Sequence, residues 1–129
     1  DNFIKAKGAI YSGASVLIES LGMDFSVIDK VYIAGGIGNN LNIENSILIG
    51  LLPDIEREKF VYIGNSSLVG SYLALISKDA KKKVQEIGTE MTYVELSVYP
   101  TYMDEFISAC FLPHTNIEQF PTVKAILGE

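Results

Sequence analysis

Three glycines near residue 36 are the residues of this sequence best placed to bind a ligand through the backbone. Gly35, Gly36 and Gly38 follow the apolar run 31–34 and lead into Asn39. Because glycine has no Cβ, a flat ring such as adenine, or a phosphate, can lie directly against its backbone. From spacing alone two interpretations stay open: one wall of a nucleotide site, or a tight turn between a strand and a helix that holds no ligand.

A second turn of the same kind follows the next apolar run, 60–63. Gly64 and Asn65 end that run and are followed by two serines. Where strands alternate with helices, the strands pair in parallel and ligands gather beyond their carboxyl ends. Both turns occupy such ends, which strengthens the ligand interpretation beyond what either turn supports alone.

Two familiar nucleotide motifs do not match the first turn. A dinucleotide fingerprint needs a third glycine where this chain has Leu41. It also needs an acidic residue after the second strand, which here ends in Ile63-Gly64-Asn65. A phosphate-binding P-loop needs a lysine after its glycine run, and this run continues into asparagine. A nicotinamide cofactor and a P-loop nucleotide are therefore not expected.

The other reactive side chains form no catalytic set that the sequence can identify. Lys5 and Lys7 precede the first turn on a helix and could reach a ribose or a phosphate, or simply be solvated. His114 has no cysteine, serine or carboxylate partner in a recognisable pattern. Cys110 lies beside apolar residues on a helix and is expected to pack rather than react. The acidic turn 54–58 is expected to be solvated, so no catalytic residue and no metal ligand is predicted.

Hydrophobic periodicity and helix caps predict the elements that must position the two turns. We expect an α/β fold, a short, mainly parallel sheet with flanking helices, in which the strand at 31–34 is covered on both faces. It would form a single domain over 1–129, with 91–129 as a tail extension packed on it. Helices are predicted at 1–22, 42–50, 68–76, 77–87, 100–110 and briefly from 120, and strands at 31–34, 60–63 and 91–98.

The first helix carries two stripes of residues at helical spacing. One stripe consists of small residues and lets a backbone or a ligand come close: Gly8, Ser12 and Ser15. The other stripe is apolar and consists of Phe3, Ile10, Ala14, Leu17 and Leu21.

The composition limits the class of protein. Of 129 residues, 48% are hydrophobic and 20% charged, which is enough to bury a core. A net charge of −6 argues against nucleic acid as a partner.

A single cysteine allows no internal disulfide and no iron–sulfur cluster within this chain. Without a signal peptide or an apolar run near twenty residues, we expect a cytoplasmic setting and no membrane partner. The start at Asp1, inside a helical pattern, indicates a piece of a longer protein.

Four segments, in this order, resemble the C-terminal part of the reductive activators of corrinoid proteins. They are AKGAIYSGASVLIESLG, VYIAGGIGNNLNIENSILIGLLPD, FVYIGNSSLVGSYLALIS and YVELSVYPTYMDEFISACFLPHTNIEQFP. The resemblance covers nearly all of residues 5–121. Its phrases AGGIGN, IGLLPD, GNSSLVG and FLPHT are specific jointly rather than singly.

The resemblance implies the second lobe of an actin-like ATPase domain, from the superfamily that includes the acetate and sugar kinases. In that superfamily the nucleotide lies in a cleft between two lobes. The cofactor-binding residues that it implies are Gly35, Gly36, Gly38 and Asn39 around the adenosine, Gly64 and Asn65 in the neighbouring wall, and Lys5 or Lys7 at ribose or phosphate.

A whole activator that resembles this family would use ATP with Mg²⁺ to reduce an inactive cobalamin-type cofactor on a partner corrinoid protein. The electron would pass through an iron–sulfur cluster outside this segment. The sequence here has neither the Asp-x-Gly phosphate loop nor the cluster-binding cysteines. The chain by itself is therefore expected to bind no cofactor tightly and to be inactive.

Two alternative functions stay open on the sequence. The lobe could be an interaction module that docks the corrinoid partner, or a second copy in a homodimer, through the tail from Met91 onward. It could also belong to an activator of another reductive enzyme, such as a 2-hydroxyacyl-CoA dehydratase.

Overall fold

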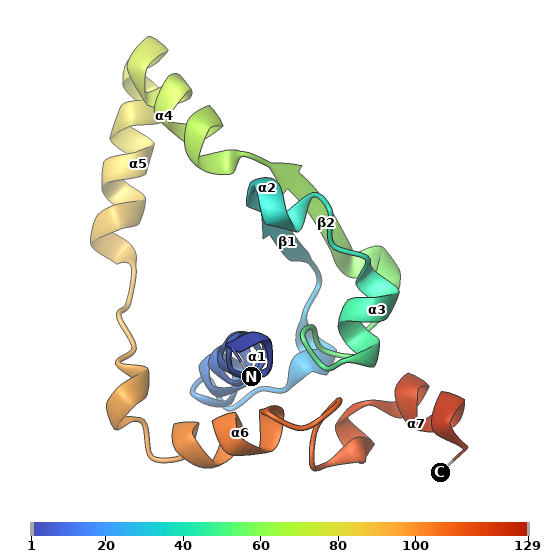
Figure 1. The fold of residues 1–129 in the computed structure, drawn as a ribbon. Coiled ribbons are helices and arrows are strands. Elements are labelled where there is room, and N and C mark those ends of the chain that lie inside the picture. Colours follow the sequence, from blue (N-terminus) through green and yellow to red (C-terminus); the bar gives the residue numbers. More distant parts are fainter. Residues whose placement is uncertain (1, 129) are drawn as a thin grey trace. The chain divides into compact units, whose positions relative to one another are not determined.

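Side-chain caps set the start of several helices in the computed structural model, which describes residues 2–128 (Figure 1). Asp24, Asn42, Asn65 and Ser77 each accept a hydrogen bond from a backbone N–H in the turn that follows. Such oxygens satisfy amides that a helix leaves without a partner. The elements are α1 Asn2–Glu19, η1 Phe25–Val27, β1 Val31–Ala34, α2 Gly35–Gly38, α3 Ile43–Leu48, η2 Arg57–Lys59, β2 Phe60–Gly64, α4 Ser66–Ile76, α5 Lys78–Glu90, η3 Leu96–Val98, α6 Tyr102–Ala109, η4 Ile117–Gln119 and α7 Pro121–Leu127.

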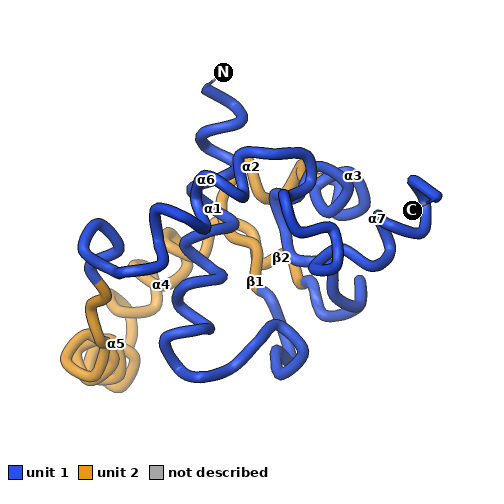
Figure 2. The backbone as a smooth tube through the Cα atoms, turned by 90° about the horizontal axis from the view of Figure 1, so that it is seen from below, with its two compact units in different colours: residues 1–31, 42–60, 95–129 blue, residues 32–41, 61–94 orange. Residues whose placement is uncertain are grey.

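The chain folds as two units, drawn in different colours in Figure 2. Unit 1 comprises residues 1–31, 42–60 and 95–129 and contains α1, α3, α6 and α7. Unit 2 comprises residues 32–41 and 61–94 and contains α2, α4, α5 and most of the two strands. From residue 95 onward the predicted tail is thus part of unit 1, and the single-domain boundary stays a prediction.

The sheet of the described residues has two parallel strands, β1 and β2, where the sequence predicted three. The strand predicted at 91–98 is wrong, because residues 91–95 have no regular structure and η3 follows them. The Glu95 carboxylate accepts hydrogen bonds from the N–H and the hydroxyl of Ser97, and this local turn competes with strand pairing. The other predicted strands and helices are present, with ends that differ by a few residues.

The small-residue stripe of α1, and not its apolar stripe, faces the interior of unit 1. Gly8 and Ser12 are buried, whereas Phe3 and Leu21 of the apolar stripe are 60% and 68% exposed. A Cβ on Gly8 would lie 2.9 Å from the Cys110 sulfur, so α1 and α6 approach closely at this point. The close approach predicted for the small stripe is therefore made by α6, which packs against α1.

The hydrophobic core lies in unit 1 and is built around an aromatic cluster. The ring of Tyr11 lies 5.7 Å from that of Phe25, 5.6 Å from that of His114 and 5.3 Å from that of Phe120. Such tilted ring pairs stabilise a core beyond the area they bury. The other buried apolar residues of this unit are Val16, Ile47, Phe60, Ala109 and Val123.

Unit 2 buries much less apolar surface. Ile33 is its one buried large apolar residue within the described part of the chain, while Tyr32 of β1 is 60% and Tyr62 of β2 is 44% exposed. The expectation that the strand at 31–34 is covered on both faces is therefore wrong for the described residues. The sheet has two short strands, and α4 packs against α5. The unit therefore has too few elements to cover both faces of the sheet.

Candidate functional site

The first glycine turn is built directly onto the end of β1 in unit 2. α2 begins at Gly35, whose φ of 87° lies in the left-handed region that favours glycine. Gly38 closes the turn against β1, since a Cβ there would lie 2.6 Å from Cγ2 of Ile33. The Asn39 N–H ends α2 by donating to the Gly35 carbonyl at 3.2 Å. The fold of the turn therefore requires two of its three glycines.

Two side chains hold the turn in place. The Asn40 amide donates to the Gly36 carbonyl at 3.0 Å. The Tyr62 hydroxyl, from β2, donates to the Leu41 carbonyl at the end of the turn. No local pattern in the sequence points to Tyr62, because its partner Leu41 lies 21 positions away.

The second turn lies at the same edge of the sheet, because β1 and β2 are parallel neighbours (Figure 1). Gly64 ends β2 with a φ of 64°, again in the left-handed region. The Asn65 side chain then accepts a hydrogen bond from the Leu68 N–H at 3.1 Å and starts α4. The structure thus brings together six of the predicted site residues, at 35, 36, 38, 39, 64 and 65.

Gly36 is the glycine of these turns that neither backbone conformation nor packing requires in the described fold. Its φ lies outside the left-handed region, and a Cβ at this position would meet no atom within 4 Å. A Cβ at Gly35 or Gly64 would likewise meet open space. The backbone is therefore accessible at both turns, and at Gly36 the absence of a side chain favours the close approach of a ligand.

The two candidate lysines lie on α1, which belongs to unit 1, whereas the glycine turns belong to unit 2. The buried Lys7 ammonium lies 2.6 Å from the Phe111 carbonyl oxygen and 2.5 Å from that of Pro113, and it also donates to the Ala109 carbonyl. Burial lowers the pKa of Lys7 to about 8. With its three donors used, Lys7 suits a structural role better than contact with a phosphate. Lys5 is exposed, and its contact with a nucleotide stays a prediction.

His114 has a carboxylate neighbour that the sequence did not reveal. Its Nε2 lies 3.6 Å from Oε1 of Glu105, and its Nδ1 accepts a hydrogen bond from the Asn116 N–H at 3.0 Å. The interaction with His114 lowers the pKa of Glu105 below its usual value, although burial opposes this shift. The His114 side chain is 2% exposed and packs against Tyr11 and Phe120, so its ring is part of the core of unit 1.

The acidic turn 54–58 is only partly solvated, which corrects the sequence prediction for Asp54. The Asp54 side chain is 0% exposed and accepts hydrogen bonds from the Thr122 N–H at 2.7 Å and from the Arg57 guanidinium at 2.8 Å. Burial by itself would raise the pKa of Asp54, but the bonds from Thr122 and Arg57 together hold it below its usual value. Asp54 therefore ties this turn to the start of α7, while Glu56 and Glu58 are exposed as predicted.

A cavity of about 590 Å³ in unit 1 is a poor candidate for a nucleotide. Its lining is rich in carboxylates, which repel phosphate: Glu19, Asp24, Asp54, Glu105 and Glu118. Across residues 2–128, no three histidine, cysteine or acidic side chains come together as a possible metal site. In the same range, no helix combines the length and the apolar character needed to cross a membrane.

The α/β fold and the paired turns agree with one class of protein. Residues 1–124 match the family described as the C-terminal domain of RACo, the ASKHA domain, and the chain belongs to this family. The predicted actin-like lobe and the predicted activator family are thereby confirmed.

Two relatives illustrate the family. A solved structure named reductive activator for corrinoid, iron-sulfur protein is 51% identical, with a TM-score of 0.88 over 94% of this chain and 19% of that one. The corrinoid activation enzyme RamQ of Eubacterium limosum is 35% identical over 102 residues, which are 79% of this chain and 17% of RamQ. The chain thus spans less than a fifth of the length of either relative.

Proposed function

We propose that this chain is the C-terminal lobe of an ATP-dependent reductive activator of a corrinoid protein, and that it supplies the adenosine side of the nucleotide cleft. The observation that carries the proposal is the pair of accessible glycine turns at one sheet edge, in a chain of the RACo ASKHA family. The residues proposed to face the adenosine are Gly35, Gly36, Gly38 and Asn39, with Gly64 and Asn65 in the neighbouring wall.

The wider reaction is proposed from the resemblance of the sequence to corrinoid activators, and the names of the relatives, which concern corrinoid activation, support it. The whole protein would bind ATP with Mg²⁺ and reduce a cobalamin-type cofactor on a corrinoid partner. The iron–sulfur cluster and the groups that bind the phosphates would lie outside this chain, whose described residues hold no cluster of metal ligands. The chain alone would bind ATP weakly or not at all and would not turn it over. The dehydratase alternative has no support among these relatives, and we do not propose it.

Gly36→Ala in the full-length protein that carries this chain tests the proposal. The added methyl group meets nothing in the fold, so the thermal unfolding temperature should not change, whereas a bound adenosine would collide with it. We expect the Kd for MgATP, measured by calorimetry, to rise at least about tenfold. Gly70→Ala in α4 is the matched control, since a Cβ there also meets no atom within 4 Å, and its Kd should equal that of the wild type. Unchanged binding by the Gly36→Ala protein contradicts the proposed adenosine site.

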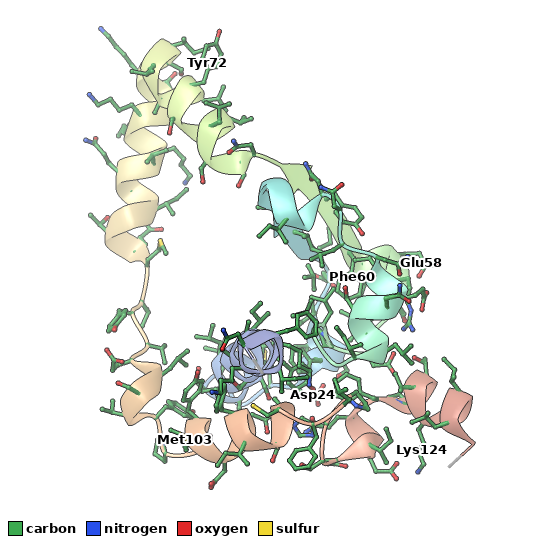
Figure 3. The ribbon with its side chains drawn as sticks, in the orientation of Figure 1. Asp24, Glu58, Phe60, Tyr72, Met103 and Lys124 are labelled. Atoms are coloured by element: carbon green, nitrogen blue, oxygen red, sulfur yellow. The ribbon has the colours of Figure 1, made fainter. Side chains whose placement is uncertain are left out.

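Exposed apolar side chains on the tail support the second candidate function, docking of the corrinoid partner. Met103, labelled in Figure 3, is 60% exposed, and Phe111 is 57% exposed. Removing the tail is not a clean test, because α6 packs against α1 and unit 1 would lose part of its core. The double substitution Met103→Ser and Phe111→Ser changes only this surface. If the doubly substituted protein captures the corrinoid partner as well as the wild type does, the tail does not dock it.

A further inference from the structure

We infer that Tyr62 is a positioning residue, which holds the first glycine turn in the shape that receives the adenosine and couples it to the second turn. This inference rests on the proposed function. Tyr62 lies on β2, two residues before Gly64, and its hydroxyl donates to the Leu41 carbonyl. Its single side chain thus links the strand that carries one turn to the end of the other turn.

Holding the Leu41 carbonyl also holds the rest of the turn, because backbone hydrogen bonds connect residues 39–41 to residues 35–38. The Leu41 N–H donates to the Gly38 carbonyl at 3.1 Å, and the Asn39 N–H donates to the Gly35 carbonyl at 3.2 Å. The Asn40 N–H makes the bond between these two, to the Ile37 carbonyl at 3.1 Å. Displacement of Leu41 would therefore be passed on to the glycines that face the ligand.

Two other interactions of the turn lie within the turn itself or on β1. The Asn40 amide bonds the Gly36 carbonyl, which lies within the turn, and Gly38 packs against Ile33 of β1. Among the side-chain hydrogen bonds of the described residues, that of Tyr62 is the one that joins the turn to β2. Without it, the spacing between the two turns would depend on the two short strands alone.

Loss of this bond should weaken nucleotide binding more than it weakens the fold. Tyr62 is 44% exposed, so water can replace a lost partner and the cost in stability is small. A turn that is no longer held must be ordered again each time the nucleotide binds, which lowers affinity. Tyr62 holds the turn assigned to adenosine, and the phosphate-binding groups are proposed to lie outside this chain, so turnover by the bound complex should persist.

Tyr62→Phe in the full-length protein, with MgATP as the probe, tests the inference. We expect the Kd and the KM for MgATP to rise about threefold to tenfold, with kcat within about twofold of the wild type. Hydrogen exchange at residues 35–41 should become faster in the absence of nucleotide. Tyr72→Phe is the matched control: Tyr72 lies on α4, is 60% exposed, and loses the same atom, so its kinetics should not change (Figure 3).

The possible results separate this inference from the proposed function. If the wild type binds MgATP and Tyr62→Phe leaves Kd and KM unchanged, the positioning role is overturned and the nucleotide site stands. If the wild type does not bind MgATP, both the proposed function and the positioning role are overturned. If Tyr62→Phe unfolds the protein, or lowers kcat with KM unchanged, Tyr62 has a role in folding or turnover and the inference is overturned as well.

Discussion

The buried ammonium of Lys7 offers the most direct test of how unit 1 is held together. It donates to the carbonyls of Ala109, Phe111 and Pro113, which lie at the end of α6 and in the segment that follows. Lys7→Met keeps the length of the aliphatic stem and removes the charge with its three donors. The end of α6 and the segment that follows it would then lose these hydrogen bonds to α1.

The expected loss of stability follows from two opposing contributions. Hydrogen bonds to a charged donor contribute about 1.5–3 kcal/mol each, and Lys7 makes three of them. Burial opposes these bonds, as the lowered pKa of Lys7, about 8, indicates. We therefore expect Lys7→Met to lower the free energy of unfolding by about 3 kcal/mol, the order found when a buried charge contact is broken.

Urea unfolding, with hydrogen exchange of the α1 and α6 amides as the local probe, measures this change. Lys30→Met serves as the control, because Lys30 is an exposed lysine of unit 1, and the substitution should alter the free energy by less than about 0.5 kcal/mol. A loss below about 1 kcal/mol for Lys7→Met would refute the reasoning. It would mean that water or other donors satisfy the three carbonyls equally well.

Three further substitutions test other contacts of unit 1. Asp54→Asn should lower the free energy of unfolding by about 1–3 kcal/mol at pH 7. The folded-state pKa of Asp54 is depressed, so its contribution to stability is present above about pH 4 and is lost as the pH falls through the folded pKa. The difference between the wild type and Asp54→Asn in urea unfolding should therefore shrink as the pH is lowered below about 4. Gly50→Ala should lower the free energy of unfolding by about 3 kcal/mol or more, because Gly50 has a φ of 75° and an added Cβ would lie 2.1 Å from the Pro113 carbonyl oxygen. A near-normal thermal unfolding temperature would contradict this packing. Gly8→Ala should lower the free energy of unfolding, because the added Cβ would lie 2.9 Å from the Cys110 sulfur. Cys110→Ala in the same chain should restore most of this loss. Additive effects of the two substitutions in a double-mutant cycle would exclude that contact.

Local signals were sufficient wherever neighbours in the sequence fix the structure. Asp24 and Asn42 cap the elements that follow them, as these residue types favour. Gly22, with a φ of 68°, closes the turn that follows α1. The same holds for Pro121, which occupies the first turn of α7. The failures came where a local alternative or a distant partner prevailed. The predicted third strand gave way to the Glu95 cap. Asp54, predicted to be solvated, is buried with Thr122 and Arg57 as its partners.

The sequence by itself determined the order of elements, the two glycine turns and the family. Only the tertiary structure decided what the chemical side chains do. It assigned Lys7 to three carbonyls about a hundred positions away, Asp54 to Thr122, and Tyr62 to the end of the first glycine turn. The physical reason is that caps and turns depend on φ, ψ and hydrogen bonds within a few residues. The partner of a buried charge, in contrast, depends on which helices pack together, and no local periodicity encodes that choice.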